Sequence, residues 1–116
     1  MDKLVSIITP TYNCAEFIGR TIDSVLLQTY KNWEMIIVDD RSKDNTREIV
    51  EEYMKKDPRI KYHLLSENAG AAVARTTAMK LAQGSYMAFL DSDDIWMPEK
   101  LERQIKWMSE NRYAFS

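Results

Sequence analysis

Four short apolar runs alternate along the chain with four segments of helical periodicity. The runs are rich in β-branched and aromatic residues and predict buried strands, at residues 4–9, 33–38, 60–65 and 86–90. In the other segments apolar residues recur every three to four positions, which predicts amphipathic helices. The alternation predicts an α/β fold with right-handed crossovers and helices on both faces of a mainly parallel sheet. The strand order that we expect is 3-2-1-4.

Prolines and glycines mark the expected ends of these elements. Pro10 is expected to end the first strand, and the second helix stops before Pro58. The alanine-rich third helix covers residues 71–83, with Gly84 placed as its C-terminal cap. Pro98 suits the first turn of a last helix.

Length and composition are those of one soluble domain. The 116 residues predict a single domain over residues 1–116, and the hydrophobic and charged fractions of 45% and 29% are ordinary. A net charge of -2 gives no electrostatic reason to expect a nucleic-acid partner, since proteins that follow phosphate backbones carry a large basic excess.

The chain shows no sign of export. Its one cysteine, Cys14, excludes an intrachain disulfide, the apolar run at the N-terminus is too short for a signal peptide, and no segment approaches the roughly 20 apolar residues of a membrane span. The expected location is cytoplasmic, and peripheral attachment at the inner face of the membrane stays open.

Polar clusters follow three of the predicted strands. The first strand leads into Thr-Pro-Thr-Tyr-Asn at residues 9–13, the second into Asp39 and Asp40, and the fourth into Asp-Ser-Asp-Asp at residues 91–94. In an open parallel sheet, ligands bind beyond the carboxyl ends of the strands. These clusters therefore predict one binding site on that edge of the sheet.

The chemistry of this edge favours a metal-bridged ligand over a backbone phosphate cradle. Neither G-x-G-x-x-G nor G-x-x-x-x-G-K-[ST] occurs in the chain. Mg²⁺ and Mn²⁺ prefer oxygen ligands, commonly one or two carboxylates together with phosphate oxygens. The carboxylates at residues 91–94 would suit such an ion, although a cap interacting with the dipole of the next helix is an alternative for Asp94.

Four motifs in this chain resemble those of the family two glycosyltransferases, in the family's order and spacing. They are "VSIITPTYN", "QTYKNWEMIIVDDRSKDNT", "ENAGAAVAR" and "AQGSYMAFLDSDDIWMPEKL", and the resemblance extends from about Val5 to Met108. It implies the Rossmann-like GT-A fold, a nucleotide-diphospho-sugar donor (usually a UDP-sugar), and Mn²⁺ or Mg²⁺ between the diphosphate and the D-x-D motif. It also implies a carbohydrate or lipid-linked acceptor in polysaccharide or glycoconjugate synthesis.

The resemblance implies a role for each matching position. The residues that would border the nucleoside are Pro10, Thr11 and Tyr12. Asp39 would accept a hydrogen bond from the uracil ring N–H, and Arg75 would approach the diphosphate or the base. Asp91 would lie by the ribose and the metal, and Asp93 would be the direct metal ligand. The family often reads A-R-N-x-G where this chain reads "ARTTAM", which keeps Arg75 and replaces the Asn.

No catalytic base can be named from the sequence. Inverting transfer needs a base that takes the proton of the acceptor hydroxyl, and in the resembled family this is an Asp or Glu well downstream of the D-x-D. We expect the base, with the acceptor-binding part, beyond Ser116; Asp94 and Glu99 are the nearest candidates within the chain.

Simpler interpretations stay open for several of these residues. Asp39 and Asp40 could form only a turn, and Arg75 could be a solvated helix residue. A signalling phosphoacceptor domain or a phosphohydrolase would place its acidic motif after the first strand, and a nucleotidyltransferase would need a glycine-rich first loop. A non-catalytic nucleotide-sugar binding module fits the motifs and is the main alternative function.

Overall fold

The computed structural model describes the backbone of residues 3–111 and the side chains of residues 3–107. Its elements alternate along the chain as β1 (Val5–Thr11), α1 (Ala15–Leu26), β2 (Trp33–Asp39), α2 (Thr46–Lys56), β3 (Ile60–Leu64), α3 (Ala71–Leu81), β4 (Tyr86–Phe89) and α4 (Lys100–Asn111). The four strands form one sheet in the order β3-β2-β1-β4, and every neighbouring pair is parallel. The predicted fold class and strand order are therefore confirmed.

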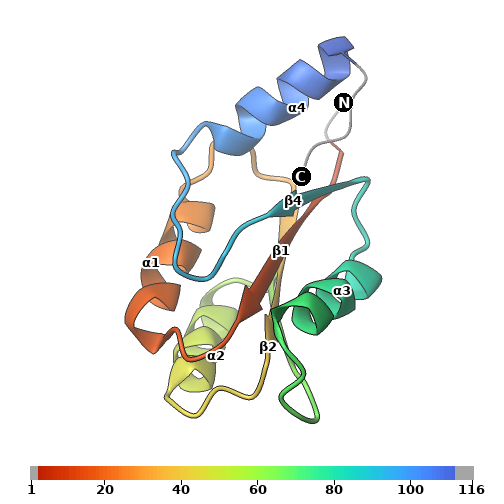
Figure 1. Ribbon diagram of the computed structural model, residues 1–116. Helices are drawn as coiled ribbons and strands as arrows, with labels where there is room; N and C mark the ends of the chain where they lie inside the picture. The colour runs from red at the N-terminus through yellow and green to blue at the C-terminus, as the bar shows by residue number, and fades with distance from the viewer. Residues whose placement is uncertain (1–2, 112–116) are drawn as a thin grey trace.

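Helices cover both faces of the sheet, as Figure 1 shows. Alternate residues of the central strands divide the core between the faces because successive side chains of a strand point in opposite directions. Ile7 and Ile37 join a cluster that includes residues of α1, α2 and α4. Ile8 and Val38 pack on the other face with the small residues of α3, Ala74 and Ala78.

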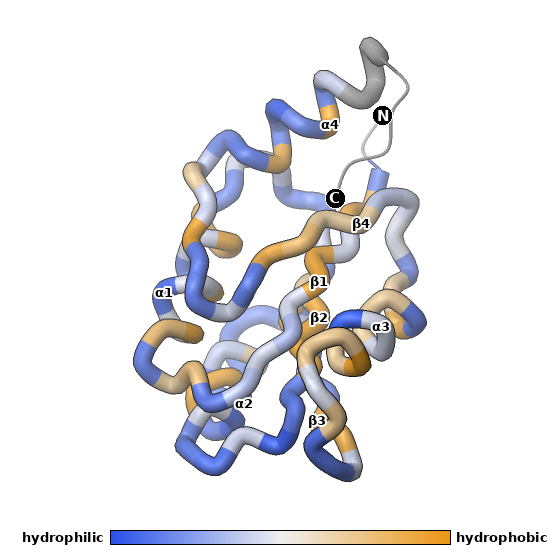
Figure 2. The backbone as a smooth tube through the Cα atoms, in the orientation of Figure 1, coloured by the Kyte–Doolittle hydropathy of each residue, from blue (hydrophilic) through white to orange (hydrophobic). Residues whose placement is uncertain are grey.

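The apolar residues are concentrated at the centre of the molecule, along β1 and β2 (Figure 2). All seven residues of β2 are buried, and six of the seven in β1. The loops that follow the strands are mostly polar, so the sheet supplies a rigid base for the side chains beyond its carboxyl ends. No helix in the described part of the chain is long and apolar enough to cross a membrane.

The prediction that Pro10 ends the first strand is wrong. The strand continues through Pro10 to Thr11, which pairs with Asp39 of β2. Pairing with β4 ends three residues earlier, at Ile8 and Phe89, so Pro10 has no β4 partner to which an N–H would have donated.

The prediction for Gly84 as a helix cap is also wrong. The helix α3 ends at Leu81, and its cap residue Ala82 has extended backbone angles. A Cβ on Gly84 would lie 2.6 Å from the carbonyl oxygen of Leu4 and 2.9 Å from the backbone nitrogen of Ser6. Gly84 is therefore needed for close approach between the loop and the start of β1.

Candidate functional site

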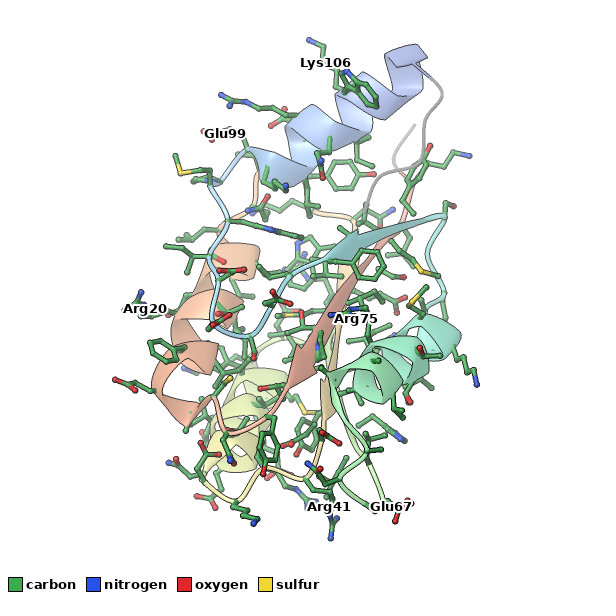
Figure 3. The ribbon with its side chains drawn as sticks, in the orientation of Figure 1. Arg20, Arg41, Glu67, Arg75, Glu99 and Lys106 are labelled. Atoms are coloured by element: carbon green, nitrogen blue, oxygen red, sulfur yellow. The ribbon has the colours of Figure 1, made fainter. Side chains whose placement is uncertain are left out.

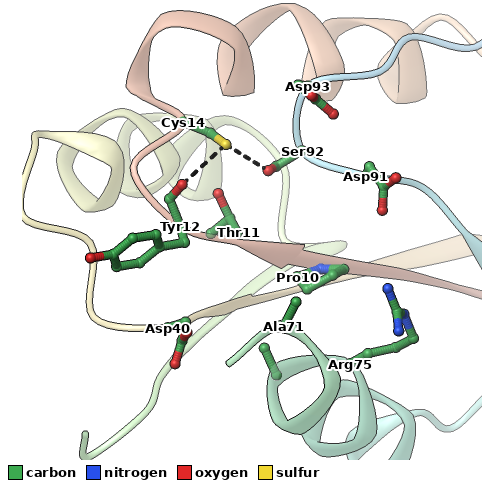
Figure 4. A pocket seen from close by; sticks show the side chains of 11 residues that line it. Pro10, Thr11, Tyr12, Cys14, Asp40, Ala71, Arg75, Asp91, Ser92 and Asp93 are labelled. Carbon is green, nitrogen blue, oxygen red and sulfur yellow. Dashed lines mark hydrogen bonds between the residues drawn. The ribbon is translucent and has the colours of Figure 1, made fainter. Parts of the chain in front are cut away.

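A pocket of about 320 Å³ lies beyond the carboxyl ends of β1, β2 and β4 (Figure 4). Its walls come from the loops after these strands and from the start of α3. The residues that line it are Pro10, Thr11, Tyr12, Cys14, Asp40, Ala71, Ala74, Arg75, Asp91, Ser92 and Asp93. Of the residues predicted to form the site, only Asp39 is missing from this lining.

An acidic cluster forms one wall of the pocket. Asp91, Asp93 and Asp94 are exposed, and each offers a carboxylate oxygen within 4.8 Å of the others. A turn closed by the N–H of Asp94 and the carbonyl of Asp91, at 3.1 Å, brings them together. No described Lys, Arg or His forms a salt bridge with any of them. A cluster of unpaired hard oxygen donors fits Mg²⁺ or Mn²⁺, and Asp91 and Asp93 also line the pocket.

Arg75 stands on the opposite wall, which belongs to α3. Figure 4 shows its guanidinium reaching across the pocket toward Asp91, and in Figure 3 it lies inside the molecule's outline whereas Arg20 and Lys106 extend outward. Arg75 is half-buried and forms no salt bridge among the described side chains. Its planar set of N–H donors is therefore available for phosphate oxygens.

The end of β1 forms the floor of the pocket. Thr11 is 3% exposed, and its hydroxyl oxygen has no hydrogen-bond partner among the described groups. A buried hydroxyl without a partner is uncommon, and a ligand in the pocket would supply one. Tyr12 is 42% exposed and presents its ring at the open end, where a flat base could stack on it.

Asp39 lies at the same edge but on the face of the sheet that α2 covers. It is 1% exposed, and its two carboxylate oxygens accept hydrogen bonds from the Ser42 N–H at 2.7 Å and the Tyr62 hydroxyl at 2.6 Å. Burial and the neighbouring Asp39 raise the pKa of Tyr62 well above its usual value, so the phenol stays a donor. The uracil contact assigned to Asp39 stays a prediction.

Asp40 lines the pocket in place of Asp39, although the resemblance assigned a role to Asp39 and none to Asp40. Its carboxylate accepts from the Asn68 side chain at 3.1 Å and from the N–H groups of Ala69 and Gly70 at 2.7 and 2.9 Å. These bonds fix the loop that leads into α3 and hence the base of the helix that carries Arg75. The sequence did contain a signal for this. Asp39 and Asp40 are adjacent at the end of a strand, so their side chains face opposite sides of the sheet and one of them had to face α3.

Further hydrogen bonds join the loops after β1 and β2. Asn13 donates from its N–H to the Ser42 hydroxyl at 2.8 Å and accepts from the Lys43 N–H at 2.7 Å. Asp44 accepts from the Ala15 N–H at 3.1 Å. Burial alone would raise the pKa of Asp44. Hydrogen bonds from Thr46 and Ala15 lower it by more than burial raises it, so the net pKa is below its ordinary value and the carboxylate stays charged. The pocket walls are thus held in place without a ligand.

Comparison with known proteins agrees with this geometry. Residues 6–116 match the family described as glycosyl transferase family 2. The chain is 56% identical over 113 residues to TuaG of Bacillus subtilis (strain 168), a glycosyltransferase assigned to teichuronic acid biosynthesis. It is 53% identical over 114 residues to the Escherichia coli UDP-Glc:alpha-D-GlcNAc-diphosphoundecaprenol beta-1,3-glucosyltransferase WfgD. These matches cover 97% and 98% of the chain, but 45% and 44% of those relatives.

Solved structures show the same fold. S. aureus TarS 1–349 in complex with UDP-GlcNAc matches with a TM-score of 0.88 and 34% identity, over 93% of this chain and 32% of that one. The mannosyltransferase PcManGT from Pyrobaculum calidifontis, in complex with GDP-Man and Mn²⁺, matches with a TM-score of 0.84 and 30% identity, over 94% of this chain and 33% of that one. The chain has the GT-A fold and belongs to the family 2 glycosyltransferases.

Proposed function

We propose that this chain binds a UDP-sugar with Mn²⁺ or Mg²⁺ and serves as the donor-binding part of an inverting glycosyltransferase. The observation that carries the proposal is the pairing of opposite charges across one pocket, with Arg75 on one wall and Asp91 and Asp93 on the other. A metal-bridged diphosphate needs both charges, because the arginine binds its oxygens while the carboxylates hold the ion.

Each wall has a separate task in this proposal. Asp93 would bind the metal directly, Asp91 would contact the metal and the ribose, and Arg75 would orient the diphosphate. When bound, a divalent ion neutralises the negative charge that grows on the departing diphosphate. The Asp40 hydrogen bonds keep the loop before α3 in position. The helix that carries Arg75 is therefore already placed before the donor binds.

The nucleoside would lie over the end of β1, against Pro10, Thr11 and Tyr12. For the uracil ring N–H we propose Asp39 as acceptor. Each of its oxygens keeps a second lone pair beside the bonds to Ser42 and Tyr62. Asp40 lines the pocket and is the competing acceptor. UDP affinity of Asp39→Ala and Asp40→Ala, each measured beside its circular dichroism spectrum, distinguishes the two.

The acceptor would be a carbohydrate or a lipid-linked sugar in polysaccharide or glycoconjugate synthesis. The E. coli relative named for transfer to a diphosphoundecaprenol-linked sugar supports the second class. We also propose that the catalytic base lies outside these residues. The carboxylates that line the pocket are Asp40, Asp91 and Asp93, of which the first is hydrogen-bonded and the others are on the metal side. A base must work on the opposite face of the sugar from the leaving diphosphate.

The first test is nucleotide binding with and without metal. We expect UDP and UDP-sugars to raise the melting temperature more with Mn²⁺ than with EDTA. A ligand at 100 times its dissociation constant stabilises a fold by about 2.7 kcal/mol. In calorimetry, Asp93→Asn should remove most of the metal dependence of UDP binding. Glu67 is an exposed carboxylate outside the pocket lining, so Glu67→Gln should keep that dependence. Equal metal dependence in wild type and Asp93→Asn would overturn the metal assignment.

The second test asks whether the catalytic base lies within these residues. The chain and full-length WfgD are incubated with labelled UDP-Glc and a panel of acceptors that includes GlcNAc-diphosphoundecaprenol. General-base catalysis contributes about 10²–10⁴-fold to a rate, so the chain alone should be slower by at least that factor. Transfer at a rate near that of WfgD would place a base within these residues, and Asp94 would be the first to mutate.

A further inference from the structure

A row of buried polar residues runs along α1, next to its apolar stripe. Thr21, Ser24 and Gln28 follow one another at spacings of three and four residues, so they lie on one side of the helix and of the turn after it. Thr21 and Gln28 are fully buried, and Ser24 is 9% exposed. Buried polar groups need hydrogen-bond partners, and besides carbonyl groups of α1 itself all three find partners in the chain segment that follows β4.

That segment is the loop between β4 and α4, which carries the acidic cluster. The Thr21 hydroxyl lies 2.6 Å from the carbonyl oxygen of Asp94, 2.9 Å from that of Ser92 and 3.3 Å from that of Phe17 within the helix. Its single proton is shared among these acceptors, and the two nearest belong to the loop. Further along the loop, Ser24 accepts from the Trp96 N–H at 3.2 Å. Gln28 donates to the Met97 carbonyl at 2.7 Å and accepts from the Leu101 N–H at 3.0 Å. Thr21, Ser24 and Gln28 thus hold this loop at intervals from residue 92 to residue 97, and Gln28 also holds the first turn of α4 at Leu101.

The contacts of Thr21 bracket Asp93. They reach the carbonyl groups of the residues before and after it, Ser92 and Asp94. The Asp93 side chain itself is exposed and forms no salt bridge with a described residue. Ser92 is held a second time, because its hydroxyl donates to the sulfur of Cys14 at the start of α1, at 2.9 Å (Figure 4). The residues around Asp93 belong to neither helix nor strand, so no regular hydrogen-bond ladder fixes them.

Three carboxylates in such a loop would move apart if nothing opposed their mutual repulsion. Anchoring the flanking carbonyl groups keeps the backbone in the turn that brings Asp91 and Asp93 together. Groups that orient metal ligands in this way typically contribute 10–100-fold to metal affinity.

We propose that Thr21 is a positioning residue for the metal site, acting through the carbonyl groups of Ser92 and Asp94. The inference rests on the proposed function, because it takes Asp91 and Asp93 as ligands of the ion that bridges the donor diphosphate. The Thr21 hydroxyl touches neither the metal nor the donor in this proposal; it fixes the backbone from which both carboxylates project.

The test compares Thr21→Val, which removes the hydroxyl and keeps the shape, with Thr21→Ser, which keeps the hydroxyl. The readouts are UDP affinity with Mn²⁺ and with EDTA by calorimetry, and Mn²⁺ affinity in the presence of UDP by paramagnetic resonance. Thr21→Val should lower the UDP affinity measured with Mn²⁺ by about 10–100-fold and leave the affinity in EDTA unchanged. Thr21→Ser should stay close to wild type in both.

Thr77→Val is the control, since the Thr77 hydroxyl on α3 donates to the Val73 carbonyl four residues earlier, at 2.8 Å, as the Thr21 hydroxyl does to the Phe17 carbonyl at 3.3 Å. If Thr21→Val does not fold, Thr21→Ala takes its place in the comparison with Thr21→Ser, because these two variants also differ in the hydroxyl. Thr21→Val or Thr21→Ala with wild-type metal dependence would overturn the inference, and so would equal losses with Mn²⁺ and EDTA. If neither hydroxyl-free variant folds, Thr21 is a structural residue and the inference also fails. Absence of metal-dependent UDP binding in the wild type would overturn the proposed function itself.

Discussion

Glu34 at the amino end of the parallel sheet and the acidic cluster at its carboxyl end use their carboxylates in opposite ways, whereas Asp39 and Asp40 at the carboxyl end are buried and hydrogen-bonded like Glu34. At the amino end, Glu34 is 3% exposed, and its side chain accepts from the Ser6 hydroxyl at 2.6 Å, the Gln83 N–H at 2.7 Å and the Lys61 ammonium at 2.7 Å. At the carboxyl end, the cluster of Asp91, Asp93 and Asp94 is exposed and forms no salt bridge with a described side chain.

Backbone strain follows the same division. The described residues with positive φ are Asn13 at 52°, Arg41 at 67° and Gly70 at 100°, and all three lie in loops after the carboxyl ends of strands. Such conformations persist where the surrounding contacts hold them, and they are common at functional sites. The amino end is therefore arranged for stability, whereas the carboxyl end retains unsatisfied charge and strain that a bound donor and metal could use.

The largest difference between the two ends should appear on removal of a carboxylate. Glu34→Ala leaves the buried Ser6 hydroxyl and the Gln83 N–H without an acceptor, at about 1–3 kcal/mol each, so we expect a loss of about 3 kcal/mol in the free energy of unfolding. Lys61 is half-exposed, so its ion pair adds little. Asp93→Ala should change stability by less than about 0.5 kcal/mol. Urea unfolding of both variants without metal checks this, and similar losses would contradict the contrast.

A glycine at the amino end offers the next test. In Gly84→Ala the new Cβ would collide with backbone atoms of Leu4 and Ser6, which cannot turn aside as a flexible side chain can. We expect a loss of about 1–3 kcal/mol in thermal or urea unfolding. Gly19→Ala, inside α1, is the matched control. Its Cβ would meet Tyr53 at an ordinary 3.5 Å, and alanine should stabilise the helix by about 0.5–1 kcal/mol. An unchanged stability for Gly84→Ala would show that the loop can move away from β1.

These two glycines also show how far the sequence could predict the molecule. Periodicity is a local property, so it located the strands and helices of the described residues, and their alternation indicated the parallel sheet. Whether Gly84 caps a helix or lies against a strand depends on which segment comes close in space, which no local pattern contains. Pro10 was misread for the same reason, because its place in a central strand is permitted only by the earlier end of β4.

The candidate site shows a similar limit. The positions of Asp91 and Asp93 after a strand could be predicted from the rule that ligands bind beyond the carboxyl ends of strands. Arg75 was predicted only from the resemblance of its motif to the family's. The roles of Asp40 and Thr21 could not, because their partners lie 28–30 and 71–73 residues away in the sequence. Thr21 was also hidden among the apolar residues of an amphipathic helix, whose pattern predicts burial and gives no hydrogen-bond partner.

Acid should weaken the amino end through Glu34. Burial alone would raise the pKa of this carboxyl, but hydrogen bonds from Lys61, Ser6 and the Gln83 N–H together hold it below its ordinary value of 4.5. A carboxyl with a lowered folded pKa contributes stability that is complete above its unfolded pKa and is lost as the pH falls through the folded pKa. The stability difference between wild type and Glu34→Gln should therefore be constant near neutral pH and shrink below about pH 4.5.

Urea unfolding at a series of pH values measures this difference, with Glu51→Gln as a control. Glu51 pairs with Arg47 on the exposed face of α2, where such pairs contribute about 0.3–0.5 kcal/mol. A difference for Glu34→Gln that stays constant down to about pH 3 would show that its hydrogen bonds do not depend on the charge of the carboxylate.

The smallest effect expected is at the strained loop after β2. Arg41 adopts a left-handed conformation that costs a non-glycine residue roughly 1–2 kcal/mol, and Arg41→Gly would remove this cost. Glycine also raises the conformational entropy of the unfolded chain, which costs about 0.4–1 kcal/mol, so the net change in stability should be small. Lys43, two residues later, has no positive φ, and Lys43→Gly keeps the backbone N–H that donates to the Asn13 side chain. This variant should therefore lose only the stability that comes from the greater entropy of its unfolded chain. Arg41→Gly should therefore be more stable than Lys43→Gly by about 1 kcal/mol in parallel urea titrations. Equal losses in the two variants would mean that the carboxyl end holds no strain at Arg41, and the contrast between the two ends would then rest on the carboxylates.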